Sequence, residues 1–176
     1  MVFIVTGSQG KGKTGFLKVL ANELKHQKIP VYGFLALGTF KNNQRNKFIL
    51  EDINTSEQAL FCDTEPQPGD ISFGRFAFKP EGKQFGLDCL KQVTEDENAI
   101  YMIDEIGLLE THQKGWHDVF GSLLDSGKNV VISVRNLYLS EIVAYFEIEN
   151  FRIFNMNNIT PEETATDIMK TISTKA

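Results

Sequence analysis

Cysteine and histidine are scarce in this chain, which has two cysteines and three histidines among its 176 residues. Cys62 and Cys89 fit no metal-site spacing, and His112 and His117 lie five residues apart instead of the four that bring two histidines to one helix face. We therefore predict no metal centre built on these side chains. We interpret both cysteines as reduced cytosolic thiols rather than a disulfide, and all three histidines as surface or helix-flanking residues.

Long apolar runs and an excess of basic residues are also missing. No run reaches the roughly 18–20 apolar residues that a membrane-spanning helix needs. The apolar segment at the N-terminus is too short for a signal peptide and has no basic region before it. Acidic residues outnumber basic ones by 23 to 18, so the net charge is −5. We expect a cytoplasmic protein with no membrane association and no general nucleic-acid-binding surface.

The chain does contain a glycine-rich stretch, around which the rest is organised. It consists of Gly7, Ser8, Gln9, Gly10, Lys11, Gly12, Lys13 and Thr14. The apolar residues 2–6 before it predict a short buried strand, and the apolar residues after it recur at helical spacing. A G-x-x-x-x-G-K-T pattern between a strand and a helix indicates a phosphate-binding loop, whereas a surface turn rich in glycine and lysine lacks this context.

The residue types of this loop suit the binding of a nucleotide. Glycines let the backbone approach a ligand, so that successive N–H groups form a nest for an anion. The helix that begins near Lys13 adds the positive end of its dipole. The Lys13 ammonium can reach the β- and γ-phosphates, and the Thr14 hydroxyl can bind Mg²⁺. We predict that residues 7–14 bind the nucleotide and that Thr14 is a metal ligand.

Predicted strands and helices alternate along most of the chain. We expect strands at about 2–6, 31–37, 47–53, 59–62, 99–103, 129–134 and 151–154, and helices at about 13–27, 84–94, 116–124, 138–145 and from 161 onward. The polar residues 39–46 predict a hairpin loop or mobile flap, and residues 64–71 predict a loop. The pattern predicts one α/β domain over residues 1–176, with three layers and a mostly parallel sheet, to which residues 31–53 add an antiparallel hairpin.

Local signals mark two helix ends and one aromatic cluster. Thr160, Pro161 and Glu163 predict a capping box at the start of the last helix, and Gly127 predicts a helix C-cap. Three phenylalanines surround Gly74, and we interpret them as a strand with its packing contacts rather than as a base-stacking surface. They are Phe73, Phe76 and Phe78.

A second motif lies at residues 99–105, where an apolar strand ends in Asp104 and Glu105. The carboxyl end of a buried parallel strand opens onto the ligand crevice of an α/β sheet. Asp104 is then placed to hold Mg²⁺ through water opposite Thr14. Glu105 is placed to orient the attacking water and accept its proton. Without the phosphate loop, the same two residues would indicate only the acidic end of a strand.

With both motifs in place, the sequence resembles the cancer-related nucleoside-triphosphatase family of small P-loop enzymes. The family's phosphate loop is matched by Gly7 to Thr14, and its Asp-Glu-Ile-Gly-x-x-Glu signature by residues 104–107 and Glu110. The resemblance spans nearly the whole chain and implies a P-loop fold of the RecA-like type. It also implies hydrolysis of several nucleoside triphosphates. At residues 37–39, 108 and 134–135 the chain departs from the residues common in the family.

Three further residues leave two interpretations open. Arg135 follows a predicted buried strand, where it either contacts the γ-phosphate or is an ordinary surface arginine. Arg45 lies in the polar segment, and a solvated loop residue is the preferred interpretation over one that closes on a nucleotide. Glu110 either braces the loop after Asp104 and Glu105 or is an ordinary N-cap residue.

We predict a Mg²⁺-dependent nucleoside-triphosphatase that converts nucleoside triphosphates, ATP and GTP among them, into diphosphate and phosphate. Lys13 and Glu105 are the predicted catalytic residues, Thr14 and Asp104 the metal ligands. One alternative is a P-loop kinase that acts on a nucleoside or another small acceptor, although the sequence has no clear acceptor-binding motif. A second alternative is a nucleotide-gated adaptor, in which Glu105 has no catalytic role. The sequence names no protein partner.

Overall fold

One sheet of nine strands organises the computed structural model, which describes residues 1–91 and 96–174. The strands are β1 (Val2–Gly7), β2 (Val31–Lys41), β3 (Gln44–Asp52), β4 (Gln58–Asp63), β5 (Ile71–Phe73), β6 (Phe76–Phe78), β7 (Ile100–Ile106), β8 (Asn129–Arg135) and β9 (Phe151–Asn155). The helices are α1 (Lys13–His26), α2 (Pro80–Leu90), α3 (Leu108–Thr111), α4 (His117–Asp125), α5 (Leu139–Tyr145) and α6 (Pro161–Ser173), with a 3₁₀ turn η1 (Asn136–Tyr138) before α5.

The strands follow the order β5-β6-β4-β3-β2-β7-β8-β1-β9 across the sheet. In this order, the neighbours from β2 through β7, β8 and β1 to β9 pair in parallel. On the other side of β2, the neighbours from β2 through β3, β4 and β6 to β5 pair in antiparallel fashion. The sheet is therefore mixed, and its antiparallel part is larger than the single hairpin that the sequence predicted. Antiparallel neighbours need only short turns, so short segments with little apolar patterning were sufficient to extend the sheet.

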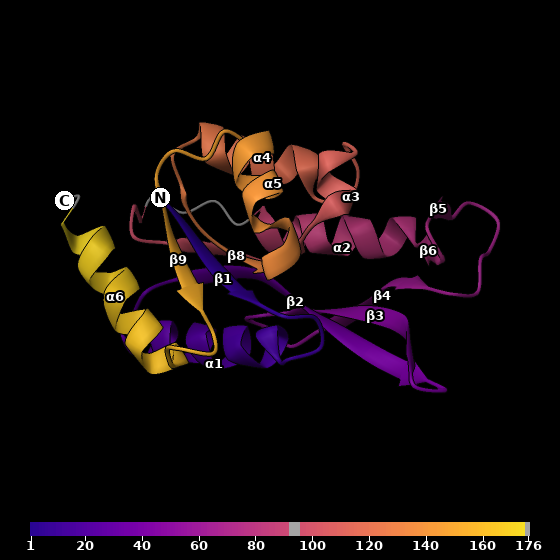
Figure 1. The fold of residues 1–176 in the computed structure, drawn as a ribbon, viewed down its shortest axis with the longest axis horizontal. Coiled ribbons are helices and arrows are strands. Elements are labelled where there is room, and N and C mark those ends of the chain that lie inside the picture. Colours follow the sequence, from indigo (N-terminus) through magenta and orange to yellow (C-terminus); the bar gives the residue numbers. More distant parts are fainter. Residues whose placement is uncertain (92–95, 175–176) are drawn as a thin grey trace.

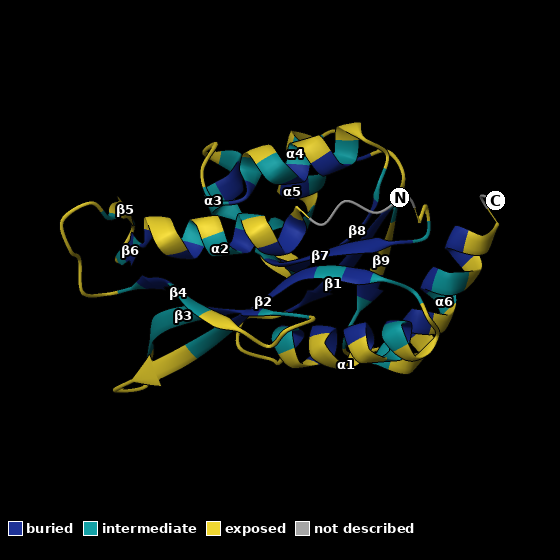
Figure 2. Cartoon of the chain, turned by 180° about the vertical axis from the view of Figure 1, so that it is seen from behind, coloured by how far each residue is buried: buried dark blue, intermediate teal, exposed yellow. Residues whose placement is uncertain are grey.

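Helices cover both faces of the parallel strands, which gives the expected three layers (Figure 1). Successive residues of a strand point to opposite faces. Phe3 and Val5 thus pack on the side of α1 and α6, whereas Ile4 packs on the side of α2, α4 and α5. Burial on both faces explains why these strands are almost continuously apolar. Figure 2 shows the central strands as buried and the outer faces of the helices as exposed.

The polar segment 39–46 is not the loop that the sequence predicted. β2 continues to Lys41, β3 begins at Gln44, and only Asn42 and Asn43 form the turn, with φ of 51° and 60°. Two positive φ values suit the two-residue turns that match the twist of a β-hairpin. The hairpin projects beyond α1 (Figure 1), so its residues are solvated and need no apolar alternation. Polarity in this segment indicated exposure and was wrongly interpreted as a loop.

Other boundaries differ by a few residues. The helix predicted at 84–94 begins earlier, at Pro80, and its described part ends at Leu90; residues 92–94 of that prediction lie outside the described residues. The strand predicted to end at residue 103 continues to Ile106, so Asp104 and Glu105 lie within β7 rather than after it. The predicted loop 64–71 gives its last residue, Ile71, to β5. Strand and helix ends are often set by tertiary contacts that local sequence does not contain.

Both predicted helix-end signals are confirmed. The Thr160 hydroxyl accepts a hydrogen bond from the Glu163 N–H at 3.2 Å, and the Glu163 carboxylate accepts one from the Thr160 N–H at 2.9 Å. Gly127 follows α4 with φ of 67°, and its N–H donates to the Leu124 carbonyl at 2.9 Å. Within residues 1–91 and 96–174, no helix combines the length and apolar character required to cross a membrane.

Candidate active site

The glycine-rich loop joins the carboxyl end of β1 to the first turn of α1. Gly12 is the N-cap of α1 with φ of 97°, a left-handed conformation that favours glycine. Lys13 is buried, and its ammonium donates to the Gly7 and Ser8 carbonyls, each at 3.2 Å. Burial lowers the pKa of Lys13, while the nearby Glu105 carboxylate opposes this effect. The Lys13 side chain therefore lies across the loop, and its positive charge lies at the N-terminus of α1.

Asp104 is the buried acid at the end of β7. Its Oδ1 accepts a hydrogen bond from the Ser133 hydroxyl at 2.5 Å, and its Oδ2 accepts one from the Ala36 N–H at 3.0 Å. Burial raises the pKa of Asp104, and the hydrogen bonds from Ser133, Ala36 and Thr14 act against this rise. Three elements thus orient one carboxylate, which lies beside the Thr14 hydroxyl.

A bulge in β7 places Glu105 on the same side as Asp104. Ile103 pairs with Ile132, and Ile106 pairs with Val134, so β7 has one extra residue between these pairs. In a regular strand, adjacent side chains point to opposite faces, and a bulge redirects them. Both carboxylates consequently line one cavity.

This cavity has a volume of about 270 Å³ and lies over the glycine-rich loop. Seven of the site residues predicted from the sequence line it: Gln9, Gly10, Gly12, Lys13, Thr14, Asp104 and Glu105. Gly7, Ser8 and Lys11 belong to the same loop but do not line the cavity, and Lys11 is exposed. Backbone and side-chain donors therefore gather on one wall and two carboxylates on another. A polyphosphate with a bound cation matches that distribution of charge.

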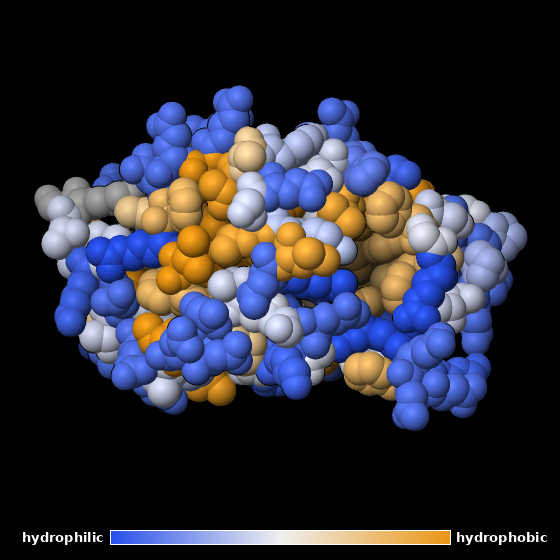
Figure 3. Space-filling model, in the orientation of Figure 1, coloured by the Kyte–Doolittle hydropathy of each residue, from blue (hydrophilic) through white to orange (hydrophobic). Residues whose placement is uncertain are grey.

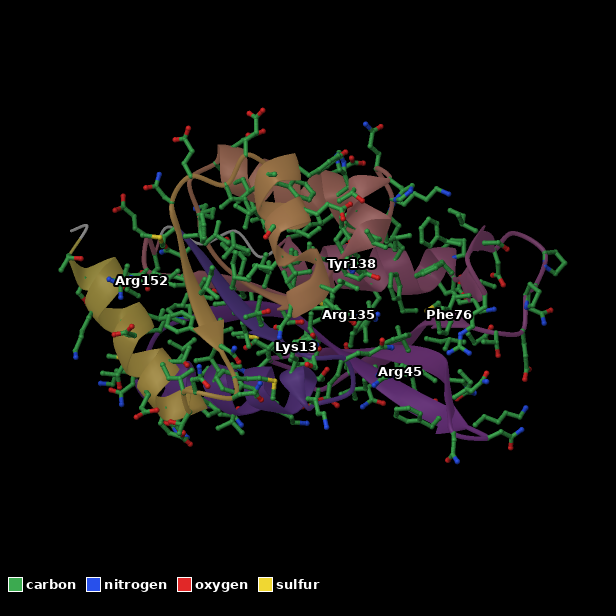
Figure 4. The ribbon with its side chains drawn as sticks, in the orientation of Figure 1. Lys13, Arg45, Phe76, Arg135, Tyr138 and Arg152 are labelled. Carbon is green, nitrogen blue, oxygen red and sulfur yellow. The ribbon has the colours of Figure 1, made fainter. Side chains whose placement is uncertain are left out.

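Two arginines complete the wall opposite the loop. Arg135 ends β8, and its Nε donates to the Glu105 Oε1 at 2.6 Å. Arg135 therefore lines the cavity and is not a remote surface arginine, and its contact with a γ-phosphate stays a prediction. Figure 4 shows Lys13, Arg45 and Arg135, which come from three separate elements, around this region. Arg135 holds Glu105 in place and adds positive charge beside it.

Arg45 also lines the cavity, which corrects its interpretation as a solvated loop residue. Its guanidinium lies 4.7 Å from the Phe40 ring centroid and 5.1 Å from that of Phe48. Such contacts between a cation and an aromatic ring are attractive. A Cβ at Gly38 would overlap the Arg45 guanidinium, so the glycine on β2 makes room for it. The hairpin β2–β3 thereby brings a third cation to the site.

Glu110 braces the segment that follows β7, and at the same time caps α3. Its Oε2 accepts a hydrogen bond from the Gly107 N–H at 2.7 Å, and its Oε1 accepts one from the Trp116 N–H at 3.1 Å. The side chain is only 2% exposed. Burial raises the pKa of Glu110 to about 7. One buried carboxyl group thus joins two turns of chain next to the cavity.

Glu110 makes the stability of the fold depend on pH. Between the pKa of an ordinary glutamate, 4.5, and the folded value of about 7, the folded protein holds a proton that the unfolded chain has released. The free energy of unfolding should therefore fall as pH rises through this window, by about 3 kcal/mol at roughly 1.4 kcal/mol per pH unit. Glu110→Gln cannot ionise and should lack this loss. Urea unfolding of both proteins across the window measures the difference, and parallel curves would contradict the prediction.

The oxygen atoms at the floor of the cavity fit a magnesium ion. Mg²⁺ prefers hard oxygen ligands and typically takes one or two carboxylates together with water and substrate phosphates. The Thr14 hydroxyl donates to the Ala36 carbonyl at 3.4 Å, the Ala36 N–H donates to the Asp104 carboxylate, and Thr14 and Asp104 both line the cavity. Among the described residues, no group of three or more His, Cys, Asp or Glu side chains could hold a metal by itself. The donor set thus suits an ion shared with a nucleotide.

Sequence reasoning missed Ser133. This residue carries the only hydroxyl of the buried strand β8 and is completely buried. A polar side chain in a fully buried apolar strand requires a hydrogen-bond partner. The serine in this apolar segment could therefore have been recognised from the sequence as part of a buried polar contact. The partner itself, Asp104, lies on the neighbouring strand and follows from the β7–β8 pairing alone.

Comparisons with known proteins show to which family the chain belongs. The model of a family described as NTPase matches residues 2–169. Nucleoside-triphosphatase THEP1 of Thermoplasma acidophilum is 27% identical over 169 residues, which cover 88% of this chain and 86% of the relative. The THEP1 protein of Methanocaldococcus jannaschii is 23% identical over 163 residues, covering 92% and 94% respectively.

Two solved structures share the fold over almost their whole length. The solution structure of a human cancer-related nucleoside triphosphatase has a TM-score of 0.70 at 19% identity, and covers 99% of this chain and 98% of that protein. The crystal structure of THEP1 from Aquifex aeolicus has a TM-score of 0.68 at 20% identity, with the same coverage. With the family model matched from β1 to α6, the chain belongs to the NTPase family.

Proposed function

We propose that the protein hydrolyses nucleoside triphosphates to diphosphate and inorganic phosphate in a reaction that requires Mg²⁺. The observation that carries this proposal is one cavity lined by Lys13 of the phosphate loop, by Asp104 and by Glu105. The names of the THEP1 relatives, which are nucleoside-triphosphatases, support the same reaction. ATP and GTP are the first substrates to test, because the names of the relatives specify a nucleoside triphosphate and no particular base.

Each charged side chain has a separate task in this mechanism. The loop N–H groups and Lys13 hold the β- and γ-phosphates. Thr14 and Asp104 are the residues that would hold Mg²⁺, which supplies neutralisation of phosphate charge when bound. Glu105 orients a water molecule toward the γ-phosphorus and accepts its proton. Arg135 fixes Glu105 through their ion pair, and together with Arg45 it balances the charge on the transferred phosphoryl group.

The direct test is the fate of the γ-phosphate in the absence of any acceptor other than water. Purified protein is incubated with Mg²⁺ and ATP, GTP, CTP or UTP in separate reactions, and diphosphate and phosphate are quantified together. We expect equal amounts of the two products with at least one nucleotide. Nucleotide binding without release of phosphate would instead indicate the adaptor or the kinase alternative, and would reject hydrolysis.

Asp104→Asn should raise the Mg²⁺ concentration needed for half-maximal hydrolysis much more than it weakens metal-free nucleotide binding. An amide keeps the size of the side chain but loses the charge through which it acts on the cation. The measurement is a Mg²⁺ titration of phosphate release, with a binding titration in EDTA as the companion. Asp118→Asn on the exposed side of α4 is the matched control. An unchanged Mg²⁺ dependence would remove Asp104 from the metal site.

A further inference from the structure

A second pocket opens beside the phosphate cavity and has a different chemical character. Its volume is about 270 Å³, and it lies between α3, the end of β7 and the antiparallel strands. Seven aromatic residues line it: Phe48, Phe61, Phe73, Phe76, Phe78, Trp116 and Tyr138. Figure 3 shows a hollow with hydrophobic walls to the right of the centre of the molecule. The proposed hydrolysis gives no task to the aromatic side chains of this pocket.

The aromatic pocket is continuous with the phosphate cavity. The two share the side chains of Asp104, Glu105 and Arg135, together with Ala36 and Phe48. In Figure 4, Phe76 and Tyr138 lie on the far side of Arg135 from Lys13. The inner end of the aromatic pocket is therefore the pair formed by Glu105 and Arg135. A molecule in this pocket would meet the γ-phosphate from the side opposite the loop.

Contacts between the rings hold the walls of the pocket in place. The Phe61 ring lies 4.8 Å from the Trp116 ring and 5.1 Å from the Phe78 ring, and Phe48 lies 5.6 Å from Phe76. These separations are typical of attractive aromatic pairs. Because each ring is supported by a neighbour on another element, the pocket is a built feature of the fold.

The chemistry of the pocket selects the class of its ligand. In another protein, an engineered apolar cavity of about 150 Å³ lined by Leu, Ile and Phe binds benzene. A pocket of about 270 Å³ with aromatic walls therefore suits a ligand of one ring or two fused rings. A nucleobase fits poorly, because its many polar edges would lose hydrogen bonds to water against phenylalanine walls. The inner end carries the ion pair of Glu105 with Arg135 at 2.6 Å and, beside it, the Asp104 carboxylate, so hydrogen-bond acceptors predominate there. It suits a neutral group that donates a hydrogen bond, and an alcohol meets this requirement.

We propose that the aromatic pocket binds a small aromatic alcohol and that its hydroxyl replaces water as the acceptor of the γ-phosphoryl group. The alcohol oxygen forms the new bond to the γ-phosphorus, and the bond from that phosphorus to the β,γ-bridging oxygen breaks. The nucleoside diphosphate leaves with the electron pair, and the alcohol proton passes to Glu105 and then to solvent. This inference goes beyond hydrolysis but rests on the proposed position of the triphosphate over the loop.

The test uses the full chain with Mg²⁺ and ATP, and benzyl alcohol or 2-naphthylmethanol as the probe. Products are followed by ³¹P NMR, which separates the phosphate monoester from inorganic phosphate. We expect ester that increases with alcohol concentration and reaches saturation, while inorganic phosphate falls and ADP equals the sum of ester and phosphate. Toluene and 2-methylnaphthalene should also bind, which ligand-observed NMR detects. They should yield no ester, because they lack the hydroxyl.

Phe73→Ala removes one wall of the pocket and lies outside the phosphate cavity. Loss of one aromatic contact should raise the half-saturating alcohol concentration about tenfold. Ile71→Ala is the matched control, because it lies on the same strand, is 53% exposed and does not line this pocket. Circular dichroism and urea unfolding report whether each variant is folded. An equal shift in both variants would argue against the pocket.

The outcomes separate this inference from the proposed hydrolysis. Steady release of phosphate without any ester at saturating alcohol, or without binding of either probe, would overturn the inference and leave hydrolysis standing. Ester formation by a protein that releases no phosphate in the absence of alcohol would support the inference and reject hydrolysis. Formation of both products, with the Phe73→Ala shift, supports both.

Discussion

Glu105→Gln should bind nucleoside triphosphate with nearly native affinity and hydrolyse it about 10²- to 10⁴-fold more slowly, which is the typical cost of losing a general base. The amide keeps the size of the side chain, and its oxygen can still accept the hydrogen bond from Arg135 Nε that Glu105 accepts at 2.6 Å. It cannot accept a proton from water. The expected result is therefore a protein that retains its substrate unhydrolysed.

Single-turnover phosphate release and equilibrium nucleotide binding, measured on the same preparation, separate the two effects. Glu141→Gln provides the matched control, since it makes the same change at an exposed position of α5 away from the cavity. Undiminished phosphate release by Glu105→Gln would remove this residue from the mechanism. A parallel loss of affinity would show instead that the carboxylate serves in binding.

Lys13→Ala should weaken triphosphate binding and abolish measurable turnover. Lys13 is 7% exposed and lies at the N-terminus of α1, where it is the lysine of the glycine-rich loop that lines the phosphate cavity. Truncating one member of a buried charge pair costs about 2–5 kcal/mol, which is roughly 30-fold to several-thousand-fold in affinity. Diphosphate binding should suffer less, because it lacks the γ-phosphate that Lys13 contacts.

Calorimetric titration with a non-hydrolysable triphosphate and with the diphosphate measures this difference. Lys170→Ala, which removes the same charge from an exposed position of α6, is the control. Lys13 also donates to two loop carbonyls, so urea unfolding of the variant has to accompany the titration. Near-normal hydrolysis by Lys13→Ala would reject the assignment of the phosphate loop.

The antiparallel extension contributes more to the site than its place at the edge of the sheet indicates. The hairpin β2–β3 brings Arg45 to the phosphate cavity, and strands β4 to β6 build the aromatic pocket. The parallel strands supply the loop, Asp104, Glu105 and Arg135. Both cavity carboxylates and Arg135 thus come from the parallel strands, whereas Arg45 and most rings of the aromatic pocket come from the antiparallel strands.

Local sequence was sufficient to predict the features that consecutive residues form among themselves. The loop at 7–14 takes its shape from its own glycines and from the strand and helix at its ends. The capping box at the start of α6 needs only Thr160 and Glu163. Continuous apolar residues likewise predicted that β1, β7 and β8 are buried on both faces, which requires helices on either side.

The tertiary structure alone decided which distant residues meet. Arg45 reaches the cavity because β3 pairs with β2, and its guanidinium lies against Gly38. Ser133 meets Asp104 because β8 lies next to β7. Shifting a strand by one residue exchanges the faces on which its side chains lie. Contacts of this kind depend on strand order, register and bulges, which are set by the packing of the whole sheet. A polar arginine and a lone buried serine therefore acquire their positions only when the sheet is complete.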